Sequence, residues 1–389
     1  MRDMKMYIFI ILVGLGVAAT GGLAAETETL SNITQINDDG FGTPANKYAF
    51  SIAVYKDSLY VGTLNIKRMP GMARFFSATS ATRATEGAEI WRYDGDGTWT
   101  QVVKAGLGNY NNFGVRKMFA AGDCLYGVTA NHDDGMEVWR TCDGDDWEIV
   151  ADRGFGDSMN TSGRGLGSFK GYIYVGVENR KNGAQLWRSA DGLEWEKVAD
   201  KGVSDSGNFW LSDFAEFKGA LYMGTLNIRG MQAYRTRDGV NLEKIFDSGL
   251  DKITNTAGMK LIVFNDRLYI STMDFLKGFD LYASEDGVNF QRVLQKGFTN
   301  KHYAYLWQME EYNGRLYAGT YHHKATVLPT GRFALLSSAD GKNWIVEDDS
   351  AFGNPWYYGV RTMAVYDGRL IIGTASAKYG CKIFMARGK

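Results

Sequence analysis

Two short sequence patterns recur through the chain at nearly constant spacing. An Asp-Gly pair followed by a bulky apolar residue returns every 47 to 54 residues, at Asp94, Asp143, Asp191, Asp238, Asp286 and Asp340. A Leu-Tyr-Val-Gly-Thr-like pattern begins at Leu59, Leu125, Ile173, Leu221, Leu268, Leu316 and Leu370. A repeat of this length holds one supersecondary unit, which cannot bury its apolar face alone. The chain is therefore predicted to stack several such units side by side.

A third pattern sets the number of units and the fold class. The loops GFGTPAN, GLGNYNN, GFGDSMN, GVSDSGN, GLDKITN, GFTNKHY and AFGNPWY make seven copies. Each unit reads as four strands with alternating apolar positions, and the last unit, residues 361–389, lacks its fourth strand. We predict an all-β, seven-bladed β-propeller of four-stranded blades. The N-terminal segment around residues 33–37 is expected to complete the last blade and close the ring, which leaves no open sheet edge.

The Asp-Gly turns are expected on the lower face of this ring, between the third and fourth strands of each blade. In the copy Ser189-Ala190-Asp191-Gly192, the carboxylate and the hydroxyl are suited to bond the amides of the turn itself. Trp195 is then expected to pack between blades. Six copies of one side chain on one face indicate a scaffold and not an active site.

These turns resemble the Asp box of bacterial sialidases and their repeats. The resemblance covers the chain from about residue 33 to its end and implies a β-propeller with Asp-box-like repeats. Folds of this type carry hydrolases, lyases, lectins and assembly factors, so the resemblance does not fix an activity. The only Arg-x-Pro, at Arg68, lies after a strand inside an inserted loop and not ahead of the first blade, which argues against a sialidase.

The N-terminus and the composition bear on location. Residues 1–25 carry basic residues, an apolar run and a small-residue end, so they are predicted to be a secretory signal peptide, with an uncleaved anchor as the alternative. Residues 26–389 are predicted to be a single domain, a monomer that is secreted or held at the cell surface and not inserted in the membrane. The formal net charge of −1 argues against a nucleic-acid partner.

Cysteine and histidine spacing bear on disulfides and metals. Cys124 and Cys142 are predicted to lie opposite one another on neighbouring strands and to form a disulfide, leaving Cys381 free. His132, His302, His322 and His323 are all expected on the upper face, and no metal-binding spacing accompanies them. We predict no metal and no cofactor.

The upper face is the predicted ligand site because rings gather there. An inserted segment, residues 67–87, overhangs it and includes Met72, Phe75 and Phe76. Aromatic faces beside polar donors suit a sugar or a partner's side chains, although some of these rings are also suited to filling the gaps between blades. The predicted ligand-binding residues are His302, Tyr303, Trp307, Tyr321, His322, His323, Trp356 and Tyr357.

Arginines occupy one repeated position, nine residues before the Leu-Tyr pattern. That position holds Phe50, Arg116, Arg164, Ser212, Met259, Trp307 and Arg361. We expect Arg116, Arg164 and Arg361 at the top of the innermost strands, near the mouth of the central channel. They either bind an anionic ligand or pair with carboxylates such as Asp157 or Asp213.

These features favour a binding module that recognises a glycan or a protein partner on its upper face. The alternative is a carbohydrate-active enzyme, a polysaccharide lyase or a glycosidase, that uses the same face. His302, Tyr303 and Arg361 would then serve as base and carboxylate clamp. No catalytic motif decides between the two hypotheses.

Overall fold

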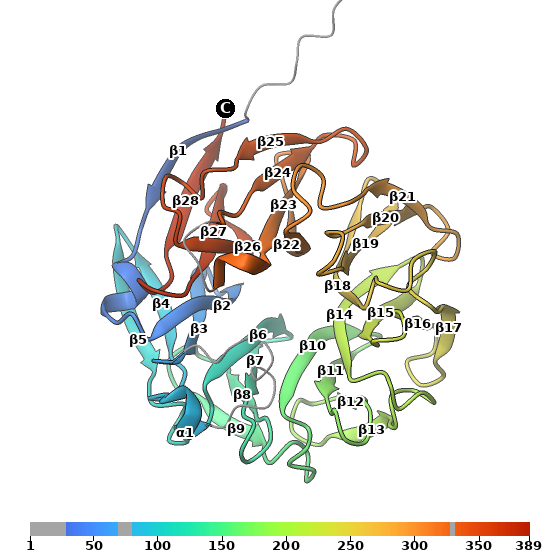
Figure 1. Cartoon of the computed structure of the whole chain (residues 1–389). Helices are drawn as coiled ribbons and strands as arrows, with labels where there is room; N and C mark the ends of the chain where they lie inside the picture. The colour runs from blue at the N-terminus through green and yellow to red at the C-terminus, as the bar shows by residue number, and fades with distance from the viewer. Residues whose placement is uncertain (1–28, 69–79, 327–330) are drawn as a thin grey trace, which may run out of the picture.

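The chain folds into antiparallel β-strands that form four-stranded units around a central axis (Figure 1). The computed structural model describes residues 29–68, 80–326 and 331–389. The strands that make up the complete units are β2 (Asn46–Tyr55), β3 (Ser58–Asn65), β4 (Ile90–Gly95) and β5 (Thr98–Val103); β6 (Gly114–Ala121), β7 (Cys124–Ala130), β8 (Val138–Thr141) and β9 (Glu148–Ala151); β10 (Ser162–Phe169), β11 (Tyr172–Glu178), β12 (Gln185–Ser189) and β13 (Glu196–Ala199); β14 (Trp210–Phe217), β15 (Ala220–Leu226), β16 (Ala233–Thr236) and β17 (Glu243–Phe246); β18 (Ala257–Phe264), β19 (Arg267–Met273), β20 (Leu281–Ser284) and β21 (Gln291–Leu294); β22 (Tyr303–Tyr312), β23 (Arg315–His322), β24 (Leu335–Ser338) and β25 (Ile345–Asp348). The remaining strands are β26 (Tyr357–Tyr366), β27 (Arg369–Ser376), β28 (Ile383–Gly388) and β1 (Leu30–Gln35), and the helical turns are η1 (Asp39–Gly42), α1 (Ser80–Arg83) and η3 (His323–Thr326).

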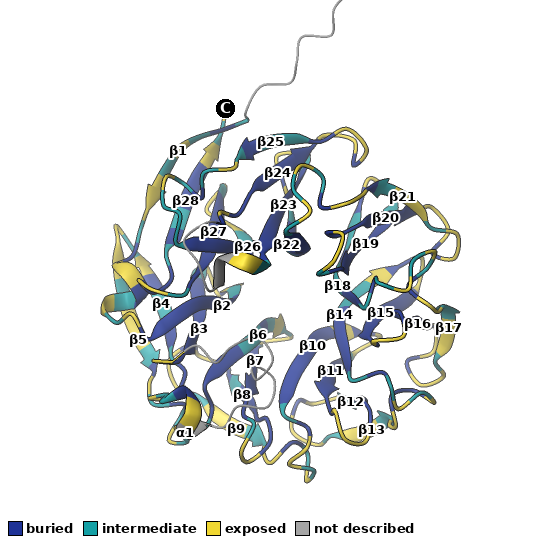
Figure 2. Cartoon of the chain, in the orientation of Figure 1, coloured by how far each residue is buried: buried dark blue, intermediate teal, exposed yellow. Residues whose placement is uncertain are grey.

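The first strand of each unit lies nearest the axis and the fourth lies outermost. The inner strands are buried, whereas outer strands such as β9 and β13 alternate between exposed and half-buried residues (Figure 2). The upper face, as we use the term, carries the loops that enter each first strand and the loops between second and third strands. The lower face carries the two remaining sets of turns. The core therefore lies between neighbouring units and close to the axis.

Two strand contacts join the N-terminal part of the chain to the C-terminal part. β2 pairs with β27 at Tyr48 and Ala375, and β1 pairs antiparallel with β28. The predicted closing strand was placed at residues 33–37, but β1 begins at Leu30 and ends at Gln35. The strand begins earlier because the Thr29 amide donates to Glu347 Oε2 over 2.7 Å and the Thr29 hydroxyl donates to Oε1 over 2.6 Å.

The lower-face Asp turns have the predicted hydrogen bonds in five copies. Asp191 Oδ1 accepts from the amides of Leu193 and Glu194 over 2.8 and 2.9 Å, and the Ser189 hydroxyl accepts from the Gly192 amide. The turns at Asp143, Asp238, Asp286 and Asp340 repeat this arrangement. They are scaffold elements, because each carboxylate is used by its own turn.

The sixth predicted copy, at Asp94, is built differently. Its carboxylate accepts from the side chains of Arg92 and Thr100, and within the described residues no amide of this turn donates to it. The position two residues earlier is arginine where the other copies have serine or threonine, and one more residue separates Asp94 from its tryptophan. The prediction of six equivalent turns is therefore wrong at Asp94.

The glycine of each regular turn contacts the preceding unit. Gly192 has φ +74°, and a Cβ added there would lie 2.0 Å from the Tyr126 hydroxyl oxygen. Tyr60, Tyr174, Tyr222 and Tyr269 approach Gly144, Gly239, Gly287 and Gly341 in the same way. Only glycine leaves room for the tyrosine, so the pair locks one unit against the next.

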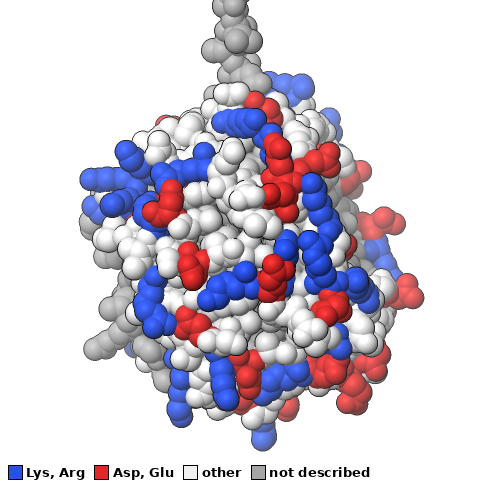
Figure 3. Space-filling model, turned by 90° about the vertical axis from the view of Figure 1, so that its right-hand side faces the viewer, with Lys and Arg blue, Asp and Glu red and all other residues white. Residues whose placement is uncertain are grey.

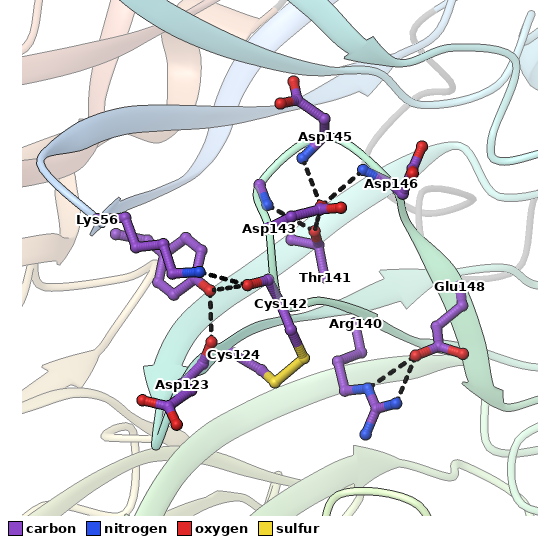
Figure 4. The surroundings of a disulfide bond; sticks show 12 residues. Lys56, Asp123, Cys124, Arg140, Thr141, Cys142, Asp143, Asp145, Asp146 and Glu148 are labelled. Carbon is purple, nitrogen blue, oxygen red and sulfur yellow. Dashed lines mark hydrogen bonds and ion pairs between the residues drawn. A yellow bond between two sulfur atoms is a disulfide. The ribbon is translucent and has the colours of Figure 1, made fainter.

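The predicted disulfide is present between β7 and the turn that follows β8 (Figure 4). The Cα atoms of Cys124 and Cys142 are 4.1 Å apart, and the neighbouring pair Leu125 and Thr141 is in register. Cys381 is a buried free cysteine, as predicted. The bond ties the lower end of one unit beside the Asp143 turn.

Some predicted segments lie outside the described residues. They are the signal peptide, residues 1–25, and Met72, Phe75 and Phe76 of the inserted segment. Among the residues that the structure describes, no helix is long and apolar enough to cross a membrane.

Candidate functional site

Every inner strand carries a β-bulge at the repeated position that holds the arginines. The register between first and second strands shifts at Phe50, Arg116, Arg164, Ser212, Met259, Trp307 and Arg361. A bulge leaves one residue unpaired and turns its side chain away from the ladder direction. The repeat register therefore marks a ring of positions in the upper half of the inner strands.

The upper part of the channel is filled by aromatic side chains. Tyr48, Tyr305, Tyr321 and Tyr358 belong to one buried cluster, in which Tyr305 stacks on Tyr321 with centroids 4.5 Å apart. The Tyr358 hydroxyl donates to the Tyr48 hydroxyl over 2.6 Å. Burial raises the pKa of Tyr48 to about 12, so this phenol is protonated at neutral pH. The channel mouth is a packed layer at this level.

Several predicted ligand residues belong to such packing. Tyr303, Tyr321 and Tyr357 are 5%, 6% and 1% exposed, and Trp307 is half-buried against the aromatic cluster. These four side chains fill space between strands, which is the second interpretation that the sequence allowed. Their part in ligand binding stays a prediction.

His302, in the turn before β22, comes together with His322 of β23 and His323 of η3. The ring centroid of His302 lies 5.7 Å from that of His322 and 5.4 Å from that of His323, and His323 Nδ1 is 3.0 Å from the His302 carbonyl oxygen. Burial lowers the pKa of His322 to about 4, so its ring is neutral at neutral pH. Asp274, in the loop after β19, forms an ion pair with Lys252 and accepts a hydrogen bond from the Thr254 hydroxyl. Among the described residues, no group of three or more potential ligands is arranged to hold a metal ion.

The asparagines that follow the Leu-Tyr patterns are structural. Asn65, Asn131, Asn179 and Asn227 each donate to a second asparagine, in the loop that enters the first strand. That second asparagine in turn donates to a glycine carbonyl six residues earlier, as Asn160 does to Gly154 over 2.7 Å. The side chains thus hold the upper loops together and are not available to a ligand.

An exposed aromatic pair remains on the upper face beside this packed layer. Trp356, in the loop before β26, and Tyr379, in the loop after β27, have ring centroids 6.2 Å apart. Lys378 Nζ lies 4.5 Å from the Trp356 ring and 4.9 Å from the Tyr379 ring. Trp356 is half-buried and Tyr379 is 38% exposed, so both rings have accessible area.

Large aliphatic side chains also face solvent in the upper loops. The four most exposed large hydrophobic residues, Leu276, Ile228, Ile253 and Tyr110, are 76%, 69%, 62% and 60% exposed. Each lies either in a loop that enters a first strand or in a loop that follows a second strand. On the lower face the Asp-turn residues Leu193, Val240 and Val288 reach only 44% to 46%. Among the described residues, the most exposed large hydrophobic side chains therefore lie in the upper loops.

The three predicted arginines do not share one site. Arg164 is buried and donates through Nε to Glu178 Oε2 over 2.7 Å, and Arg180 also pairs with Glu178 over 2.6 Å. Although burial opposes ionisation of Glu178, the two arginines lower its pKa. Arg164 therefore pairs with a carboxylate, as one interpretation predicted, but with Glu178 and not with Asp157 or Asp213. Asp157 accepts from the Asn179 side chain instead.

Arg116 and Arg361 lie together in the channel. Their guanidinium carbons are 4.9 and 4.5 Å from the centroid of the Phe50 ring, and that of Arg361 is 5.1 Å from the Trp307 ring. Arg361 is 7% exposed. Burial lowers its pKa to about 10, which leaves it charged at neutral pH. Both side chains line a cavity of about 280 Å³ below the aromatic cluster.

The charged residues of this cavity were largely missed from the sequence. Lys117 and Lys260 line it and hold Asp213 from two sides, with Nζ to carboxylate distances of 2.8 and 2.9 Å. Although burial opposes ionisation of Asp213, the two lysines hold its pKa well below the usual range. Lys117 and Lys260 each follow a bulge residue by one position, and that repeat register was the signal that would have found them.

The inserted segment also sends one unexpected side chain into the fold. Arg83, in α1, is fully buried, with its guanidinium carbon 4.2 Å from the Phe113 centroid. Its Nη2 lies 3.3 Å from His132 Nδ1. His132 therefore anchors the insertion over the upper face and does not join the other histidines.

Comparisons with known proteins address the fold. No protein-family model matches the sequence, and no curated protein matches it. The structure is similar to the WD40 β-propeller domain of Doa1, with a TM-score of 0.51 and 11% identity over 92% of this chain and 96% of that one. It is also similar to Raptor of Chaetomium thermophilum (TM-score 0.55, 12% identity, 93% of this chain and 29% of that one) and to a prolyl endopeptidase (0.51, 9%, 89% and 51%). The chain spans about half of the prolyl endopeptidase and under a third of Raptor. At these identities the likeness shows the fold alone, which is a β-propeller.

Proposed function

We propose that the protein is a secreted or cell-surface binding module, a propeller of seven blades whose upper face recognises a partner. The blade count is supported by the grouping of 28 antiparallel strands into four-stranded units, the last completed by β1. The Asp-box-like repeat is supported by the five turns that share one hydrogen-bond pattern. The disulfide between Cys124 and Cys142 is consistent with an oxidising compartment.

The observation that carries the proposed function is that the most exposed large hydrophobic side chains of the described residues lie in the upper-face loops. Leu276, Ile228 and Ile253 are more than 60% exposed in loops of adjacent units. Exposed apolar area that gathers on one face of a folded protein is typical of an interaction surface. Aliphatic side chains favour a protein partner, because they offer burial without directional hydrogen bonds.

A glycan is the second candidate partner. It is favoured by two aromatic rings and a lysine that lie together elsewhere on the upper face. Trp356 and Tyr379 offer aromatic faces, and Lys378 offers a donor beside them. Sugars bind in this manner, with ring stacking and a few polar contacts. This platform lies in the last unit, apart from the aliphatic residues.

Two of the three residues that suggested the enzyme hypothesis, Tyr303 and Arg361, give it no specific support. Tyr303 is 5% exposed and burial raises its pKa to about 12, so the phenol is not a base at neutral pH. Arg361 lies in the channel beside Phe50 and not on the upper face. We therefore propose binding without turnover.

The test uses an array of glycans and extracellular proteins with two matched double variants. Ile253→Ser with Leu276→Ser changes the upper face, and Leu193→Ser with Val240→Ser changes the lower face. We expect the upper-face variant to lose a protein signal that the lower-face variant keeps, and Trp356→Ala to lose any glycan signal. Equal binding by all variants would contradict the proposal. Shortened or unsaturated oligosaccharides among the products would identify an enzyme instead.

A further inference from the structure

The central channel holds an excess of cationic groups below the aromatic layer. Four cationic side chains line the cavity, namely Arg116, Lys117, Lys260 and Arg361, together with two carboxylates, Asp213 and Glu216. The side of the molecule seen in Figure 3 is different, because basic and acidic side chains are interspersed over it. The charge imbalance is therefore a property of the channel and not of the whole surface.

The carboxylates do not neutralise the two arginines. Asp213 is held by both lysines, and Glu216 is exposed near the lower end of β14. In the described ranges, 29–68, 80–326 and 331–389, no carboxylate lies within ion-pair distance of Arg116 or Arg361. Two like charges thus lie against one ring, Phe50, and repel each other.

Stacking on phenylalanine does not satisfy a guanidinium. The ring attracts the positive charge, but its face accepts none of the five N–H hydrogen bonds that arginine donates. Arg361 Nε is buried and has no hydrogen-bond partner among the described residues. A buried donor without an acceptor is costly, so the site is built for an acceptor that the chain itself does not provide.

We propose that this cavity, lined by Arg116, Lys117, Lys260 and Arg361, is a binding site for a small oxyanion such as a sulfate, phosphate or carboxylate group. An oxyanion between the two arginines accepts several charge-assisted hydrogen bonds and offsets their repulsion. The volume of about 280 Å³ is large enough for such a group. This site is separate from the upper face, since the aromatic cluster lies between them.

The geometry also indicates how the anion enters. Tyr48, Tyr305 and Tyr358 are packed in the buried cluster above the arginines, whereas the cavity lining extends down to the exposed Glu216 beside the lower hairpin of β14 and β15. The oxyanion therefore approaches from the lower face. A partner on the upper face leaves this route open.

Calorimetric titration with sodium sulfate, at an ionic strength held constant with sodium chloride, tests the site. We expect saturable binding to the wild type. Removing one charge-assisted contact in Arg116→Gln or Arg361→Gln is expected to weaken it about tenfold or more. Arg140→Gln is the matched control, because Arg140 pairs with the exposed Glu148 on the outside of its unit. This control is expected to bind sulfate as the wild type does.

A second pair of measurements keeps the test decisive. If Arg361→Gln does not fold, Arg116→Gln and Arg361→Lys replace it, since Lys keeps the charge and loses the forked donors. Titration with glucuronate and with uncharged glucose then distinguishes an acidic sugar from an inorganic anion as the source of the group. Equal sulfate affinity in Arg116→Gln and Arg140→Gln, or a sulfate effect that chloride reproduces, would overturn the proposal.

Discussion

The lower-face turns and the bulges of the inner strands are both repeated elements, yet their side chains are used in opposite ways. In the turns at Asp143, Asp191, Asp238, Asp286 and Asp340, the same atoms make the same bonds in each unit. At the bulges the backbone repeats while the side chain changes from Phe50 to Arg116, Ser212 or Trp307. Repetition of a side chain thus accompanies packing between units.

The difference has a physical basis in what each position faces. A regular Asp turn meets a tyrosine of the preceding unit, and this contact is the same in all five copies, so one solution serves all of them. A bulge faces the shared channel, where seven identical side chains would repel or collide. Variation there allows an aromatic layer above and a charged cavity below, and this is where a ligand has room to bind.

The largest expected effect is at the one junction that the repeats do not build. Deleting residues 26–37 removes β1, exposes the edge of β28 and leaves Glu347 without the Thr29 donors. Burial of Leu30 and the lost hydrogen bonds together predict a loss of about 5 kcal/mol or more. Limited proteolysis and thermal melting measure it. A truncated chain that melts like the full one would show that β1 does not close the ring.

The next effect tests the non-repeated charges of the channel. Asp213→Asn leaves Lys117 and Lys260 without their shared carboxylate, and breaking a buried ion pair costs about 4 kcal/mol. The exposed pair of Arg140 and Glu148 is the control, because Glu148→Gln is expected to cost less than about 1 kcal/mol. Urea denaturation at pH 7 compares the two variants, and a similar small cost in both would contradict the account.

The same residue predicts a pH dependence. The folded protein holds the pKa of Asp213 below its usual value of about 4. The contribution of this carboxylate to the stability of the fold is therefore complete above that pH. It is lost as the pH falls through the acid range, because the unfolded chain takes up the proton first. Between about pH 5 and about pH 2, the wild type is therefore expected to lose more free energy of unfolding than Asp213→Asn does. Parallel acid titrations would contradict this.

The disulfide is a feature of a single unit and is expected to have a somewhat smaller effect. Replacing Cys124 and Cys142 by alanine removes a cross-link over a sequence separation of 18, which the chain-entropy relation values at about 3 kcal/mol. Thiol counting on denatured, unreduced wild type is expected to give one group, from Cys381. Three reactive thiols would show that the bond does not form.

How far the sequence predicted these regions follows from the same comparison. The strands, the turns and the disulfide were predictable, because each depends on local pattern and register, as the opposed positions of Cys124 and Cys142 illustrate. The sequence pattern also identified the repeated position that the arginines occupy. Their destinations were not, since the pairing of Arg164 with Glu178 of the neighbouring strand and the packing of Arg361 against Phe50 depend on side-chain contacts that the repeat pattern does not specify. Arg83 was missed because nothing in its segment repeats.

The smallest effect compares a regular turn with the irregular one. Gly192 and Gly95 both have positive φ, +74° and +92°, so alanine strains the backbone at either position. At Gly192 the new Cβ also meets the Tyr126 hydroxyl at 2.0 Å, whereas at Gly95 nothing lies within 4 Å. We expect Gly192→Ala to cost about 2 kcal/mol more than Gly95→Ala, because Tyr126 must leave its place between units. Chemical denaturation of the two variants measures the difference. Adding Tyr126→Phe removes the nearest colliding atom but leaves two ring carbons at 2.6 and 2.7 Å, so it is expected to recover only part of the loss at Gly192 and to leave Gly95→Ala unchanged. Equal costs in the two single variants would mean that the tyrosine does not lock neighbouring units together.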